Sequence, residues 1–171
     1  MTVMTGPPEI DPALVRAAQR GDRIAVAGLM DALAPYVGRV CGPIALQDGP
    51  DAAQEALIAI FRNLARLREP VAIYGWARAI AVREAVRVAR RAARTIPAEL
   101  PDVPAPGDPE LAADIRDVLA RLTPDHRAVL VLRDLEGLDE QAAGALLSLP
   151  AATVRSRLFR ARRSFRKAWS P

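Results

Sequence analysis

The sequence has one cysteine, one histidine and few aromatic residues, and each shortage excludes a kind of protein. With Cys41 alone, neither a disulfide nor a cysteine zinc site can form within the chain. Its apolar surroundings, YVGRVCGPI, predict a buried structural thiol. Aromatic residues make up 4% and hydrophobic residues 51% of the 171 positions, so the core is aliphatic. Small side chains at this density, without any alternating strand pattern, predict an all-α fold.

Candidate catalytic and metal-binding groups are equally scarce. His126 follows Thr-Pro-Asp on the predicted first turn of a helix, and without a set of further ligands a surface or capping role is favoured over metal binding. We therefore expect a protein that is not an enzyme and needs no metal or cofactor. The N-terminus lacks the pattern of a signal peptide, and the longest uncharged runs fall short of the roughly 20 residues that span a bilayer. These features predict a cytoplasmic protein without membrane insertion.

Capping signals predict four helices in the first half. Asp11 with Pro12, and Asp22 directly after Gly21, are typical of helix starts and ends. Pro35 predicts a bend or break in the second helix, because proline cannot donate the backbone hydrogen bond. The four helices are expected at about 12–20, 23–40, 51–68 and 73–94.

A proline-rich segment then interrupts the helical pattern. The stretch TIPAELPDVPAPGDPE, residues 95–110, holds five prolines and four acidic residues in sixteen positions. A helix cannot pass through this density of proline. We interpret residues 95–110 as an acidic linker between two small helical domains, residues 1–94 and 111–171.

The second domain ends in an unusually basic helix. A short predicted helix after Asp139, a turn at Ser-Leu-Pro and the segment AATVRSRLFRARRSFRKAW at 151–169 form a helix-turn-helix pattern. Seven basic residues and no acidic one lie between Arg155 and Lys167. An apolar stripe runs along the same helix, at Val154, Leu158, Ala161, Phe165 and Ala168. The stripe predicts docking onto the domain, and the uncompensated charge favours DNA binding over a solvated basic surface.

Nearly the whole chain resembles a known family. The stretch LTPDHRAVLVLRDLEGLDEQAAGALLSLPAATVRSRLFRARRSFR resembles the C-terminal domain of bacterial sigma factors of the extracytoplasmic-function type, in the sigma-70 family. RGDRIAVAGLMDALAPYVGRV, DAAQEALIAIFRNLARL and YGWARAIAVREAVRVARR resemble the N-terminal domain of the same factors. The resemblance implies a sigma factor that binds core RNA polymerase and directs promoter recognition and transcription initiation. Its partners would be core RNA polymerase and promoter DNA, with an anti-sigma factor as a further candidate.

The resemblance also implies roles for single residues. Polymerase docking falls on Asp51, Gln54 and Glu55. Recognition and melting of the −10 element fall on Trp76, Arg83, Arg87 and Arg90. Recognition of the −35 element falls on Thr153, Arg155, Ser156, Arg157 and Arg160. From the residues alone, Trp76 serves equally well as a core anchor, and Glu55 is an ordinary helix-surface charge.

Several positions depart from the pattern of the family, among them Arg83, Arg87 and Ser148. Arg83 stands where these factors usually have asparagine, and Arg87 where they usually have aspartate. Ser148 replaces the usual glycine of the helix-turn-helix turn, which would cost free energy if its φ angle is positive. The alternative function is a stand-alone helix-turn-helix regulator, which the last third of the chain fits equally well.

Overall fold

The structure is a computed structural model that describes residues 7–94 and 109–169. The described residues contain helices and no strand, which confirms the all-α prediction. The first half holds α1 (Pro12–Gln19), α2 (Arg23–Ala45), α3 (Gly49–Asn63) and α4 (Ile73–Ala92), with short 3₁₀ turns between the last three. The second half holds α5 (Pro109–Ala120), α6 (Pro124–Leu130), the π-helical turn η4 (Val131–Leu135), α7 (Glu140–Leu147) and α8 (Ala151–Trp169).

The helix starts lie where the capping residues predict them. The Asp11 carboxylate accepts a hydrogen bond from the Ala13 amide at 2.7 Å, and Asp22 accepts one from Ile24 at 2.9 Å. In the second half, Asp139 accepts from the Ala142 amide at 2.7 Å and begins α7. These short side chains satisfy amides that have no partner within the helix, so the sequence fixes the boundaries locally.

The second helix differs from its prediction. α2 runs without interruption through Pro35 and Pro43 to Ala45, so of the predicted bend or break at Pro35 the break is wrong. Leu33 and Val37, which flank Pro35, are fully buried, and this burial outweighs the roughly 3 kcal/mol that an internal proline costs. The helix ends instead at Ala45, and Leu46, with a φ of 56°, begins the short 3₁₀ turn that leads to α3.

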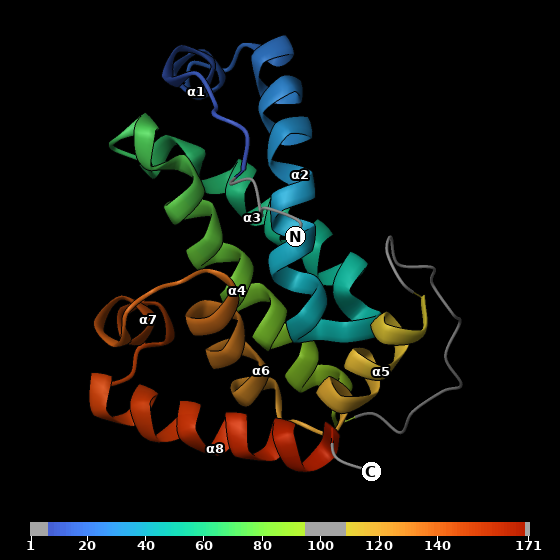
Figure 1. The fold of residues 1–171 in the computed structure, drawn as a ribbon. Helices are drawn as coiled ribbons and strands as arrows, with labels where there is room; N and C mark the ends of the chain where they lie inside the picture. The colour runs from blue at the N-terminus through green and yellow to red at the C-terminus, as the bar shows by residue number, and fades with distance from the viewer. Residues whose placement is uncertain (1–6, 95–108, 170–171) are drawn as a thin grey trace.

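The core of the first half lies among α2, α3 and α4 (Figure 1). Leu29, Leu33, Val37 and Ile44 of α2 and Ile60 of α3 are fully buried there. The helical stretch Arg23–Arg66 contains a segment that is long and apolar enough to cross a membrane, judged by length and composition alone. Its inward side chains are covered by the neighbouring helices, as in the central helix of a globular domain.

In the second half, α8 packs against both α6 and α7, and α7 also contacts the π-helical turn η4 (Figure 1). Gly144 of α7 allows a close backbone approach, because a Cβ atom there would lie 2.5 Å from the Leu149 carbonyl oxygen. Ser148 ends α7 in the left-handed conformation, with a φ of 55°. The φ angle of Ser148 is therefore positive, which is the case in which serine in place of the usual glycine costs free energy.

The two halves lie directly against each other, with α6 and α7 packed on α2 and α4 (Figure 1). Arg127 of α6 is 6% exposed and donates from Nε to the carbonyl oxygen of Ile44 at 2.7 Å. Buried apolar residues form one continuous core across the junction. Residues 95–108 of the predicted linker lie outside the described residues, whereas Pro109 and Glu110 already belong to α5.

Candidate nucleic-acid interface

The basic helix α8 buries the predicted apolar stripe. Val154 and Ala161 are fully buried and Leu158 is 5% exposed, against α6 and α7. Phe165 and Ala168, further along the same stripe, are half-buried. Because these contacts fix the rotation of α8, the opposite side of the helix faces outward from the edge of the molecule (Figure 1).

The outward side of α8 carries residues that the sequence reasoning only partly identified. Ala152, Ser156, Phe159 and Arg163 follow one another at steps of four, three and four, and all are exposed. Phe159 is 64% exposed, so its ring is open to solvent on this face. The same helical spacing that located the buried stripe would have located this face, which lies half a turn away.

Several arginines of α8 are paired with carboxylates, so the charge of the helix is not uncompensated as the sequence suggested. Arg155 is 73% exposed and its Nη2 lies 2.6 Å from Oε2 of Glu140. This hydrogen bond lowers the pKa of Glu140. Arg162 forms an ion pair with Asp134. The carboxylates come from preceding elements, which a count along α8 alone does not include.

The remaining predicted residues of α8 divide between two sides. Thr153 is half-buried, and its carbonyl oxygen accepts a hydrogen bond from the Ser156 hydroxyl at 3.0 Å. Arg160 is exposed and donates to the Ser156 carbonyl oxygen at 3.3 Å. Arg157 lies on the inward flank and pairs with Asp125 of α6 at 3.2 Å.

α4 presents a second basic surface beside the first. Arg83, Arg87 and Arg90 are exposed along one side of the helix. Arg90 reaches across to the second half, where its Nη2 lies 2.6 Å from Oδ1 of Asp125. Arg87 turns toward α3 and pairs with both Glu84 and Glu55, at 2.5 and 3.3 Å. The structure thus joins Glu55 of the predicted docking helix to Arg87 of the predicted −10 helix.

Trp76 lies partly in the core and partly beside a cavity. Its side chain is half-buried and packs against the core. It also lines a cavity of about 290 Å³ between α3 and α4, together with Asn63, Arg83 and Glu84. A polar cavity beside an aromatic ring and an arginine is suited to an unpaired base.

The predicted docking residues lie on the outer face of α3. Asp51, Gln54 and Glu55 are all exposed. The same face continues with Ile58 and Phe61, which are 40% and 55% exposed and which the sequence reasoning missed. Exposed apolar residues next to acidic ones are typical of a protein–protein interface.

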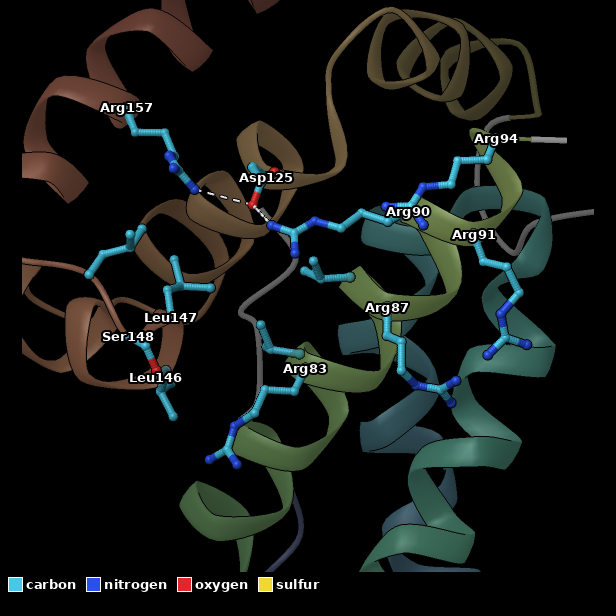
Figure 2. Close-up of a pocket in the computed structure, with 13 residues that line it drawn as sticks. Arg83, Arg87, Arg90, Arg91, Arg94, Asp125, Leu146, Leu147, Ser148 and Arg157 are labelled. Carbon is cyan, nitrogen blue, oxygen red and sulfur yellow. Dashed lines mark hydrogen bonds and ion pairs between the residues drawn. The ribbon is translucent and has the colours of Figure 1, made fainter.

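A cleft lies between the two halves, with a volume of about 490 Å³. Figure 2 shows Arg90 and Arg157 approaching Asp125 from opposite sides, whereas Arg87 and Arg91 point away toward α3. Leu146, Leu147 and Ser148 of the helix-turn-helix turn form the other wall. Across residues 7–94 and 109–169, no group of three potential ligands among histidine, cysteine, aspartate and glutamate could hold a metal ion.

The fold and the two arginine-rich helices define a DNA-binding protein of two helical halves. The family models of sigma-70 region 2 and sigma-70 region 4 match residues 29–95 and 112–165. The RNA polymerase sigma-H factor of Pseudomonas aeruginosa is 32% identical, over 95% of each chain. The ECF RNA polymerase sigma-E factor of Escherichia coli is 31% identical, over 89% of this chain and 90% of its own.

Solved structures agree with the fold. CnrH in complex with the cytosolic domain of CnrY matches with a TM-score of 0.63 and 22% identity, over 92% of this chain and 95% of that one. The sigma factor RpoE from Bartonella quintana, in complex with the anti-sigma factor NepR, gives a TM-score of 0.68 at 17% identity, over 83% and 94%. This chain belongs to the sigma-70 family, among the sigma factors of the extracytoplasmic-function type. It binds core RNA polymerase and directs promoter recognition.

Proposed function

We propose that residues 1–94 bind core polymerase and the −10 element, that residues 111–171 bind the −35 element, and that the segment predicted at 95–110, whose last two residues belong to α5, links the two. The main support for this division of roles is that the two sides of α8 differ in character. One side docks through Val154, Leu158 and Ala161, and the other offers arginine, serine and phenylalanine outward. A helix held in this way after a tight turn is suited to the major groove.

The −35 element is read by the outward face of α8. Ser156, Phe159 and Arg163 lie at the centre of this face, with Arg155 and Arg160 beside them. Arginine pairs with guanine through two hydrogen bonds, and phenylalanine contacts the methyl group of thymine. Thr153 and Arg157, near the start of the helix, contribute contacts to bases or phosphates once DNA is bound.

The −10 element is bound and melted by α4. Arg83, Arg87 and Arg90 supply positive charge along the helix for the phosphates of a separated strand. The cavity beside Trp76 is suited to an extruded base. With arginine at positions 83 and 87, the helix is more basic than the family pattern, which increases the contribution of phosphate contacts.

Core polymerase is bound by the outer face of α3. Asp51, Gln54 and Glu55 provide polar and acidic contacts, and Ile58 and Phe61 provide apolar area for the centre of the interface. The protein acts in the cytoplasm, where core polymerase and promoters are found. Relatives of this fold have been solved with an anti-sigma factor or with the cytosolic domain of CnrY, and we propose a comparable protein partner here.

Run-off transcription with purified core polymerase tests this function. The chain and core together should give a transcript from a promoter selected from a genomic library, and neither should do so alone. Scrambling the −35 element should abolish the transcript. A chain that binds DNA specifically but never supports initiation by core would instead be a stand-alone regulator.

A further inference from the structure

We propose that α1 and the chain segment between α3 and α4 form a further nucleic-acid surface, which holds the unpaired DNA strand between the −10 element and the start of transcription. Four exposed arginines make up this α1 surface, namely Arg16 and Arg20 of α1 and Arg66 and Arg68 of the segment after α3. The surface extends the proposed −10 site, and its role rests on the proposed binding of that element by α4.

Two hydrogen bonds fix α1 against the segment that follows α3. Nε2 of Gln19 donates to the carbonyl oxygen of Leu64 at 3.0 Å and to that of Leu67 at 2.7 Å. The two arginines of α1 are one helical turn apart, on the exposed side of the helix next to Gln19. The two arginines of the segment flank Leu67 in the sequence. Both pairs therefore lie at one end of the molecule, opposite α8 (Figure 1).

The positive charge of the α1 surface is not neutralised within the described residues. Across residues 7–94 and 109–169, none of its four arginines forms an ion pair with a carboxylate. Two acidic residues close in sequence, Asp11 and Asp22, instead accept hydrogen bonds from backbone amides at the starts of α1 and α2. Arg87 and Arg155, by contrast, are already paired with glutamates. The α1 surface can therefore bind phosphates without first breaking an ion pair.

The α1 surface continues directly from the proposed −10 site. Arg66 lines the cavity beside Trp76 that is suited to an extruded base. From this cavity α4 runs toward Arg90, at the end from which the chain continues to the half that binds the −35 element. DNA upstream of the cavity therefore follows α4. A strand that leaves the cavity toward the start of transcription runs the opposite way, over the α1 surface.

An unpaired strand is the partner that fits this chemistry and this position. Next to a cavity that takes an extruded base, the DNA is already separated, and the backbone of a separated strand follows positively charged surfaces. Guanidinium groups bind phosphate oxygens through charge-assisted hydrogen bonds, which carry no sequence information. The α1 surface should therefore hold the strand next to the −10 element whatever its bases are.

Binding of single-stranded probes by the holoenzyme tests the α1 surface. For each promoter strand, a short probe ends at the −10 element, and a longer probe continues toward the start of transcription by about six nucleotides. The strand that binds should do so on the order of tenfold more tightly in its longer form at about 0.1 M salt, with a salt slope steeper by about 0.7 for each added phosphate contact. Changing the base sequence of the extension should leave this gain unchanged.

A double variant of α1 and a matched control on α5 assign the gain to its residues. Arg16→Gln with Arg20→Gln should lower the salt slope for the longer probe by about 0.7 for each arginine that contacts a phosphate, and leave the short probe unaffected. Arg116→Gln with Arg121→Gln removes the same charge from α5, which lies far from α1 (Figure 1), and should affect neither probe.

Three results would overturn the proposal: the α1 variant binds the longer probe as tightly as the wild type, it weakens both probes equally, or the α5 control causes the same loss. A gain that depends on the bases of the extension would also overturn it. Failure of the wild-type holoenzyme to bind the short probe on either strand is a different result, because it would refute the proposed −10 site itself.

Discussion

The Tyr36 hydroxyl donates a hydrogen bond of 2.8 Å to the Glu136 carboxylate, although the two residues lie 100 positions apart. Glu136 follows the π-helical turn of the second half, and Tyr36 lies in the middle of α2. Burial and the neighbouring carboxylate raise the pKa of Tyr36 well above its usual value near 10. This contact depends on the way the two halves pack, and its strength can be measured.

Tyr36→Phe should lower the free energy of unfolding by about 1–2 kcal/mol, because it leaves the Glu136 carboxylate short of a donor. Urea denaturation followed by circular dichroism measures the change. Tyr74→Phe is the control, since the Tyr74 hydroxyl donates to the Pro8 carbonyl oxygen in an exposed position and should contribute less. A Tyr36→Phe variant as stable as the wild type would show that the contact contributes nothing to the fold.

Gly144→Ala should destabilise the second half by about 1–3 kcal/mol, because the new methyl group would meet the Leu149 carbonyl oxygen 2.5 Å away. Gly38→Ala is the matched control in α2, where a Cβ atom has nothing within 4 Å. That change should stabilise the protein by about 0.5–1 kcal/mol, because alanine is the better helix former. Thermal unfolding measures the stability of both variants. If their melting temperatures shift in the same direction, the prediction is contradicted.

Substitutions in α8 should separate base recognition from phosphate binding. Arg155→Ala, Arg157→Ala and Phe159→Ala should each cost about 1–3 kcal/mol at a single base pair of the −35 element. Lys167→Ala should weaken binding to all sequences alike and lower the salt slope by about one unit at most. Val154→Asp should unfold the domain, because it places a charge in the fully buried stripe.

The measurement for α8 is binding of the holoenzyme to single-base variants of the −35 element at several salt concentrations. If a substitution removes the sequence preference at one base pair only, the substituted residue contacts that base. If Arg155→Ala and Arg157→Ala weaken every variant equally, these two arginines bind phosphates only, and the central residues of the outward face carry the recognition.

Glu55→Lys should weaken binding to core polymerase on the order of tenfold while leaving the fold intact, because it reverses a charge in the proposed interface. Glu55 is half-exposed, and its pairing with Arg87 is solvated, so little stability is lost. Asp31→Lys, an exposed substitution on α2, controls for net charge. Unchanged affinity in a folded Glu55→Lys variant would remove this residue from the interface.

Cys41 should resist alkylation in the native protein between pH 7 and 9. Its side chain is fully buried, and burial raises the pKa of its thiol to about 12, so the reactive thiolate is scarce. Because the native pKa is the higher one, the stability linked to this proton is present below the unfolded pKa near 8.5 and is lost as the pH rises above it. Labelling in native buffer, compared with labelling in urea, measures the protection.

The sequence determined the helices wherever the signal is local. Asp11, Asp22, Thr123 and Asp139 each cap a helix within three residues of their own position, so no distant partner is needed. The apolar stripe of α8 is likewise set by the period of the helix, and its spacing correctly predicted burial of Val154, Leu158 and Ala161. The resemblance in the same segments led to the sigma-70 family, which the comparisons confirm.

The tertiary structure decided those features that depend on contacts between residues far apart in the sequence. Helix propensity predicted a bend or break at Pro35, yet burial of neighbouring side chains keeps α2 continuous. Counting charges along α8 could not show that Asp125, Asp134 and Glu140 neutralise three of its arginines. The contact of Arg90 and Arg157 with one carboxylate arises only when the halves meet, because helical periodicity specifies which side of a helix is apolar but not which helix will cover it.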